Sequence, residues 1–352
     1  MTRIIVAGAA AAAAAATPLA AWACATCGCS LSSDIQAGYS TGYSTGSGWQ
    51  VSLLDSYIDQ SQLRTGSHAV SPAQVAAIND AGGSQEVERQ TVNNYVTLGV
   101  GYSPNMNWNF NLQLPYIDRY HTTYGNATTD QLAPSDVSKA SLDDIGDAKL
   151  IASYQGLLPT HNLGVQLGVK LPTGNYGGQN TATGATVGRH PVFFSTGPNG
   201  ALGQALDTAL QPGTGSTDII VGAYYAQAVS QDFDAFVNGQ FEVAVQEQLT
   251  GLNQNFRPGN LGNLSTGMRY MHSATWTPQV QVDISHKSPD QGALADDFDT
   301  AGTVVYLTPG VTVAVTPAAR IYGFVQVPVA SWLEGYQMFP RWTGNLGISY
   351  AF

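Results

Sequence analysis

The last twelve residues of the chain, Arg341-Trp-Thr-Gly-Asn-Leu-Gly-Ile-Ser-Tyr-Ala-Phe352, separate into two chemically different faces. Mostly apolar and aromatic residues occupy every second position from Trp342 to Phe352, and polar or small residues lie between them. Because side chains alternate across a strand, the stretch predicts a β-strand with one apolar face and one polar face. Its length matches the roughly 9–11 residues with which a tilted strand crosses a bilayer.

A closing strand that ends on Phe, with aromatic residues at alternate positions, resembles the C-terminal signature of Gram-negative outer-membrane β-barrels. The last strand of a soluble β-sandwich is the alternative, since it shows the same alternation. Composition favours the barrel. Only 11% of the 352 residues are charged, against roughly 25% in soluble globular chains, while the mean hydropathy of −0.05 is too low for a helical membrane protein. The net charge of −11 argues against nucleic acid as a partner.

The N-terminus resembles a secretory signal peptide. Arg3 precedes an Ala-rich run, and Ala21-Trp-Ala23 fits the small-x-small rule for cleavage before Cys24. A retained transmembrane helix over 4–23 is disfavoured, since Ala is weakly hydrophobic and Pro18 interrupts the run. Trp22 also fits poorly to lipid attachment at Cys24. We therefore expect 1–23 to be removed, with 24–48 as a periplasmic segment and 49–352 as the barrel.

The remaining chain predicts an all-β fold, a transmembrane antiparallel up-and-down barrel of about twelve strands. Residues 162–173 show the pattern clearly, with aliphatic side chains from Leu163 to Leu171 alternating with Gly, Gln and Lys170. A register slip would turn Lys170 toward lipid at a cost of roughly 2–4 kcal/mol, so the apolar face must point outward. The strand-like segments cover approximately 49–58, 90–102, 107–118, 146–157, 162–173, 217–229, 233–246, 260–272, 276–287, 302–315, 319–332 and 341–352.

The connections between these segments alternate in length. Short turns lie at 103–106, 158–161, 230–232, 273–275 and 316–318, whereas the other links are longer. Short turns on one side and long loops on the other are typical of outer-membrane barrels. The pattern predicts periplasmic short turns, extracellular long loops and both termini in the periplasm. Aromatic residues near the short-turn ends would form an interfacial girdle; they are Trp49, Tyr102, Trp108, Tyr270, Trp276 and Tyr350.

Three stretches carry a resemblance to a known family. Asp144-Ile-Gly-Asp147-Ala-Lys149 begins one predicted strand, Val169-Lys-Leu-Pro-Thr-Gly174 ends the next, and Gly213-Thr-Gly-Ser-Thr-Asp218 begins the one after it. In this order they resemble the outer-membrane protein family named for the meta-pathway of phenol degradation, over about 145–352. The resemblance implies an outer-membrane transporter of small, often aromatic or hydrophobic compounds. It supplies no residue roles, and the cysteine motif is not part of its pattern.

A barrel of about twelve strands lies between eight-stranded barrels filled by side chains and 16-stranded open porins. We expect its lumen to pass or hold one small solute. The inward-facing set predicted from alternation combines charges with aromatic rings that suit an amphipathic solute. It comprises Asp147, Lys149, Lys170, Asp218, Tyr224, Phe236, Glu242, Arg269, Asp283, Tyr306, Arg320, Tyr322, Phe324 and Arg341. A mutually satisfied network that braces the wall is the alternative role for the charges, and narrowing of the lumen is the alternative for the rings.

The longest loop, 174–216, is rich in Gly, Thr and Asn, and loops of that length are usually functional or disordered. It either folds inward as a constriction or covers the surface. The acidic clusters at 143–144 and 296–299 lie at predicted extracellular strand ends. We expect a solvated charged rim there, with divalent bridges to lipopolysaccharide as the alternative.

Three cysteines, Cys24, Cys27 and Cys29, lie where the chain enters the periplasm, an oxidising compartment. A disulfide is the first expectation and leaves one thiol over. A Cu(I) or Zn site is the alternative, since closely spaced thiolates favour soft metals. No other cofactor is expected. The segment also offers a docking site for a periplasmic protein.

Together these features predict an outer-membrane channel or transporter for small aromatic, hydrophobic or amphipathic solutes, with lipid and lipopolysaccharide around it. A structural, electron-transfer or metal-handling component that docks a periplasmic partner through 24–29 is the second candidate. A lipid-modifying barrel enzyme is a third and weaker one. We expect no enzyme, because the six histidines are scattered and no Ser-centred constellation accompanies them.

Overall fold

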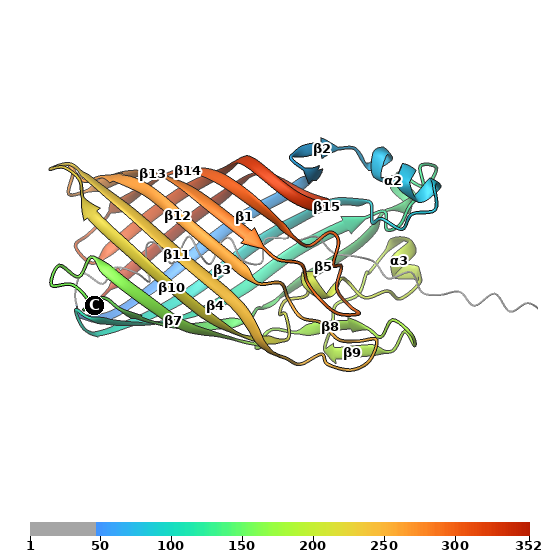
Figure 1. Ribbon diagram of the computed structural model, residues 1–352, viewed down its shortest axis with the longest axis horizontal. Helices are drawn as coiled ribbons and strands as arrows, with labels where there is room; N and C mark the ends of the chain where they lie inside the picture. The colour runs from blue at the N-terminus through green and yellow to red at the C-terminus, as the bar shows by residue number, and fades with distance from the viewer. Residues whose placement is uncertain (1–46) are drawn as a thin grey trace, which may run out of the picture.

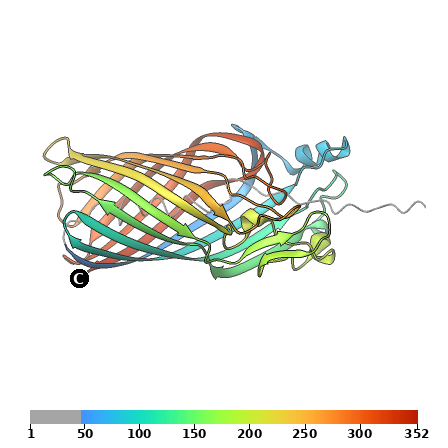
Figure 2. The same ribbon diagram turned by 60° about the horizontal axis from the view of Figure 1, so that its bottom comes forward.

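The computed structural model describes residues 47–352. The predicted signal peptide, Cys24, Cys27, Cys29 and nearly all of the predicted 24–48 segment lie outside these residues. The described chain forms a closed antiparallel barrel of eleven strand elements, with two further strands, β2 and β5, attached to the wall (Figures 1 and 2). No helix within 47–352 is long and apolar enough to cross a membrane.

The eleven elements of the wall follow one another in chain order around the barrel. They are β1 (Gly48–Gly66), β3 (Glu88–Asn105), β4 (Trp108–Thr123), β6 (Ala148–Tyr154), β7 (Leu163–Leu171), β10 (Ser216–Ala228), β11 (Phe233–Glu247), β12 (Leu261–Tyr270), β13 (Trp276–Lys287), β14 (Gly302–Ala314) and β15 (Ala319–Ala351). Smaller elements lie in the long loops. They are β2 (His68–Val70), α2 (Pro72–Asp80), η2 (Pro134–Asp136), β5 (Ser138–Ile145), the β8 (Tyr176–Gln179) and β9 (Thr186–Arg189) hairpin, α3 (Gly197–Ala201) and η3 (Thr208–Leu210).

The barrel closes where β15 pairs with β1. Trp49 and Phe352 exchange two backbone hydrogen bonds there, each 2.9 Å long. The 33 residues of β15 fold back on themselves as two arms. The two ends of the element lie side by side, as shown by the hydrogen bond that the Ala351 amide donates to the carbonyl oxygen of Ala318. The part before Leu333 pairs with β14 and the part after it with β1, so the predicted segments 319–332 and 341–352 are the two arms of one element.

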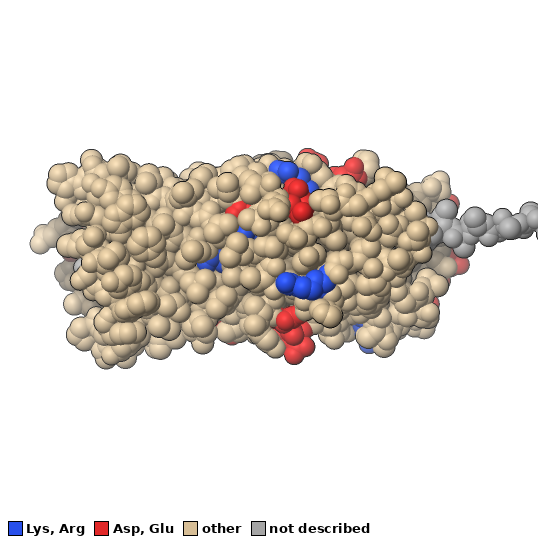
Figure 3. Space-filling model, turned by 90° about the horizontal axis from the view of Figure 1, so that it is seen from below, with Lys and Arg blue, Asp and Glu red and all other residues tan. Residues whose placement is uncertain are grey.

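The barrel is apolar outside and polar inside. On β7, Leu167 is 63% exposed whereas Gln166 next to it is 4% exposed. The closing strand shows the same alternation, with Leu346 at 61% and Asn345 at 4%. Figure 3 shows a wall with few charged side chains, most of them in its middle and toward the loop end. The predicted separation of the two faces is confirmed.

The connections are sorted by length between the two ends of the barrel. The tight turns and the C-terminus lie at one end, called here the turn end, and α2, α3, β8 and β9 lie at the other, the loop end (Figure 1). Three strands extend further toward the loop end than the alternation predicts. β1 continues to Gly66, β3 begins at Glu88 and β4 runs to Thr123. These extensions carry both apolar and polar side chains on their inner faces, because loop segments pack against the inner face there.

The largest apolar core lies inside the loop end. Ile58, Tyr95 and Ile117 from the wall pack with Leu206 and Leu210 from the loop between β7 and β10. Leu206 and Leu210 are at most 1% exposed, and the buried Arg119 guanidinium of β4 donates to the Leu210 carbonyl oxygen. Of the two arrangements open for the 174–216 loop, the structure shows the inward one.

Candidate functional site

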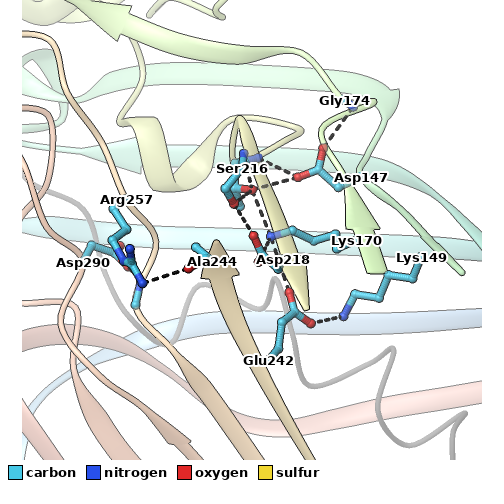
Figure 4. A network of polar contacts seen from close by, with 12 residues as sticks. Asp147, Lys149, Lys170, Gly174, Ser216, Asp218, Glu242, Ala244, Arg257 and Asp290 are labelled. Carbon is cyan, nitrogen blue, oxygen red and sulfur yellow. Dashed lines mark hydrogen bonds and ion pairs between the residues drawn. The ribbon is translucent and has the colours of Figure 1, made fainter. Parts of the chain in front are cut away.

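Four neighbouring strands place a balanced charge cluster on the inner wall (Figure 4). Lys149 of β6, Lys170 of β7 and Asp218 of β10 stand directly across from one another in the register. The Lys149 ammonium lies 2.7 Å from a Glu242 carboxylate oxygen, and that of Lys170 lies 2.5 Å from Asp218 and 3.4 Å from Glu242. Two cations thus meet two anions, which offsets the cost of burying each charge.

Asp147 anchors both ends of the inserted loop to the wall beside this cluster. Its Oδ1 accepts a hydrogen bond from the Gly174 amide (3.1 Å), and its Oδ2 accepts from the Thr214 amide (2.8 Å) and hydroxyl (2.9 Å). The backbones of Gly174 and Gly213 approach so closely that a Cβ on Gly174 would lie 2.9 Å from the Gly213 Cα. We call this arrangement of Asp147, Gly174, Gly213 and Thr214 the loop clasp. The three motifs at 144–149, 169–174 and 213–218 meet in it.

The predicted inner aromatic residues are held in place by polar and ring contacts. The Tyr224 hydroxyl donates to Gln155 Oε1 at 2.9 Å, and the Arg269 guanidinium lies 5.4 Å from the centre of the Phe236 ring. Tyr322 and Phe324 pack with Leu54 in a small buried cluster.

Two further members of the predicted set lie on β14 and β13, between β15 and β12. Tyr306 is fully buried beside Val304, Leu333 and Phe339. Asp283 accepts hydrogen bonds from the Gln281 amide group (2.7 Å) and the Thr308 hydroxyl. Buried polar groups and aromatic rings therefore share the inner surface.

Two predicted inner residues, Arg320 and Arg341, are exposed. Arg320 lies near the turn end, paired with Ala314 of β14. Arg341 lies in a β-bulge, because Ile58 pairs with Thr343 and Gln60 with Pro340. The bulge interrupts the alternation between strand faces at this point.

A cavity of about 800 Å³ opens among the loops at the loop end. Apolar side chains line it beside amide groups of Asn and Gln residues, and the carboxyls of Asp136 and Asp207 also border it. Ala127, Leu206 and Leu294 exemplify the apolar lining, and Gln131 and Asn199 the polar lining. Cavities of roughly 300–1,000 Å³ with this mixture are typical of small-molecule sites.

The acidic cluster 296–299 fits the predicted solvated rim only at Asp297, which is exposed. Asp296 and Asp299 are each only 3% exposed. Asp296 Oδ1 accepts from the Phe298 and Asp299 amides, and Asp299 Oδ1 accepts from the Tyr336 amide at 2.9 Å. Burial and the Asp296 carboxyl raise the pKa of Asp299 to about 8. At the other cluster Asp143 is exposed, and its Oδ2 accepts a hydrogen bond from the Tyr116 hydroxyl.

One group of described residues has the chemistry of a metal site. Glu86, His121 and Asp207 bring three potential ligand atoms within 4.8 Å of one another. Sequence reasoning treated His121 only as a scattered histidine and did not single out the other two. The three residues come from segments far apart in the chain, and no spacing signal links them.

No protein-family model matches the chain, and the comparison with curated proteins finds no match. Among solved structures, an outer membrane channel from Pseudomonas putida F1 is similar, with a TM-score of 0.58 and 12% identity over 89% of this chain and 98% of that one. The translocator domain of the autotransporter NalP from Neisseria meningitidis has a TM-score of 0.48 and 10% identity over 91% and 96%. The CymD monoaromatic hydrocarbon channel has a TM-score of 0.40 and 10% identity over 87% of this chain and 89% of that one. The first likeness shows the fold; the other two are too weak to add to it.

Proposed function

We propose that this protein is an outer-membrane channel for small aromatic, hydrophobic or amphipathic solutes. The observation that carries the proposal is the loop-end cavity of about 800 Å³, lined by apolar and amide side chains. A cavity of this size suits one small molecule. The P. putida protein with the same fold is an outer membrane channel, and the three motifs that resemble the phenol-pathway family also favour a channel of this kind.

The apolar exterior supports placement in a membrane. Side chains such as Leu167 and Leu346, each more than 60% exposed, face outward from the wall, where contact with lipid would remove them from water. If the two arms of β15 count as separate strands, the chain crosses the membrane twelve times. The turn end, with the C-terminus, would then face the periplasm, and the loop end would face the cell exterior and the lipopolysaccharide.

The polar inner wall provides a route beyond the cavity. The inserted loop narrows the loop end through Leu206 and Leu210, so a solute from the cavity must pass this constriction or displace it. Below it, the balanced charge cluster and Tyr224 present paired polar groups and an aromatic ring. Such a surface can bind an amphipathic solute without holding it by an unpaired charge.

Uptake into liposomes tests the proposal directly. We expect vesicles containing the purified protein to take up toluene or phenol faster than protein-free vesicles. Ala293→Trp should slow this uptake several-fold, because Ala293 lines the cavity and is half-buried. Ala182→Trp is the matched control, since Ala182 is exposed and lies outside the lining. Equal uptake by the parent protein and by empty vesicles would overturn the proposal. If both tryptophan variants slowed uptake equally, the cavity would not be the site through which the solute passes.

A further inference from the structure

Three buried ligand side chains meet where the inserted loop contacts the wall. Glu86 lies two residues before β3, His121 near the end of β4, and Asp207 immediately before η3 in the inserted loop. Their exposed fractions are 2%, 0% and 7%, and one atom of each lies within 4.8 Å of the others. The resemblance gives no role to these three residues, and of the three only Asp207 lines the loop-end cavity.

The hydrogen bonding of His121 leaves its second ring nitrogen available. Nδ1 lies 2.9 Å from the Thr91 hydroxyl, which holds the ring in place. Nε2 is buried and has no hydrogen-bond partner among residues 47–352. When Nδ1 donates to Thr91, Nε2 carries a free lone pair, and metal-bound histidines are commonly oriented through the other nitrogen in this way.

Asp207 gives a second, independent indication. Its Oδ2 is buried and, within the described part of the chain, accepts no hydrogen bond. A buried carboxylate without a compensating partner is costly.

A guanidinium and a further carboxyl lie near the cluster. Arg119 is the neighbouring cation on the same face of β4, and it donates to Asn93, Tyr95 and the Leu210 carbonyl oxygen. Glu86, Asp207 and the nearby Asp296 contribute three carboxyls to this region. A divalent cation beside Asp207 would compensate its buried, unpartnered carboxylate oxygen.

We infer that Glu86, His121 and Asp207 bind one divalent transition-metal ion, with Zn²⁺ as the best chemical match. Imidazole nitrogen and carboxylate oxygen are both donors that Zn²⁺ accepts, and three protein ligands leave its fourth position to water. Ca²⁺ and Mg²⁺ prefer all-oxygen sites with more ligands. The ion joins the segment before β3, the wall at β4 and the inserted loop, so it pins the constriction to the barrel. Its role goes beyond the proposed function, since it secures the loop, although Asp207 also borders the loop-end cavity.

The cysteines must be removed from the test because they could bind Zn²⁺ themselves. We would use the full chain with Cys24→Ser, Cys27→Ser and Cys29→Ser, purified in detergent, stripped with a chelator and titrated with Zn²⁺ alone. The expected result is one Zn²⁺ per chain. Glu86→Gln, His121→Gln and Asp207→Asn should each weaken binding at least about tenfold, the lower end of what even a supporting residue contributes. Glu88→Gln is the matched control: Glu88 is 2% exposed like Glu86 but lies outside the cluster, so binding should persist.

Two outcomes would overturn the inference: no Zn²⁺ bound by the cysteine-free parent, or binding left unchanged by all three cluster variants. Co²⁺ provides a readout that does not depend on whether the variants fold. The cysteine-free parent should show visible Co²⁺ absorption without a thiolate charge-transfer band, and absence of that absorption would also count against the site. Zn²⁺ should further slow proteolysis of the 174–216 loop in the parent, and this protection should be lost in Asp207→Asn.

Discussion

Lys170 and Asp218 form an ion pair of 2.5 Å between directly paired positions of β7 and β10, inside the barrel. Lys170 also lies 3.4 Å from Glu242, so one ammonium serves two carboxylates. Its side chain is 7% exposed and that of Asp218 is 4% exposed. In this setting, loss of one partner matters more than the net contribution of the pair, because a buried charge is left uncompensated.

Lys170→Met should therefore destabilise the barrel by about 3–5 kcal/mol. Asp218→Asn should cost less, since Lys170 keeps Glu242. The measurement is the urea midpoint for loss of the folded band in unboiled gels. The double variant should cost less than the sum of the two single variants, because neither charge is then left alone. Single variants that unfold at the parent's midpoint would show that the cluster is not buried as described.

Asp147→Asn should loosen the inserted loop. An Asn side chain retains one acceptor, so either the Gly174 amide or the Thr214 amide loses its partner, at a cost of about 1–3 kcal/mol. The expected result is faster proteolytic cleavage within 174–216 while the barrel itself keeps its folded gel mobility. Asp130→Asn provides an exposed control in another loop of the same end. Equal cleavage rates in both variants would contradict the clasp.

The folded conformation of the loop at 288–301 should become less stable as the pH rises. Burial and Asp296 raise the pKa of Asp299 to about 8 in the folded state, above the ordinary value of 3.8. A raised carboxyl pKa means that the folded state holds the proton more tightly. The contribution to stability is full below about pH 4 and is lost as the pH rises through about 8. Proteolysis of this loop should accelerate over that range in the parent, and much less in Asp299→Asn. A pH-independent parent would contradict the shift.

Leu167→Arg should impair membrane insertion. Leu167 is 63% exposed on the outer face of β7, and an arginine that faces lipid near the midplane costs about 2–4 kcal/mol. Leu202→Arg is the matched control, because Leu202 is 80% exposed but follows α3 at the loop end. Folding yield into lipid vesicles should fall for the first variant and stay near the parent's for the second. Equal yields would argue against lipid contact at β7.

Strands with strict alternation were predictable, and segments without it were not. The segment 162–173 predicted β7 because aliphatic residues occupy every second position from Leu163 to Leu171, with Gly, Gln166 and Lys170 between them. The ends of β1, β3 and β4 near the loops escaped prediction. In the β1 extension Leu63 is buried and Ser61 is exposed, which reverses the apolar-outside pattern of the wall, so the period-two signal does not continue. The β8–β9 hairpin and α3 also escaped prediction, because they lie in a Gly-rich stretch that shows no regular alternation.

The candidate site divides in a similar way. The alternation of side chains along a strand predicts that residues such as Lys149 and Asp218 point inward. It does not predict which residues of neighbouring strands they pair with. Their ion pairs depend on the stagger between β6, β7, β10 and β11, which no single strand encodes. The burial of Asp296 and Asp299 escaped prediction because neighbouring acidic residues in a loop are usually solvated.

The sequence by itself determined that the chain presents an apolar face and a polar face from Trp49 to Phe352, because side-chain alternation is a local property of every strand. Only the tertiary structure decided that the 174–216 loop turns inward and that Glu86, His121 and Asp207 meet. These contacts join positions far apart in the chain, and they arise from closure of the wall and from burial of Leu206 and Leu210 inside it.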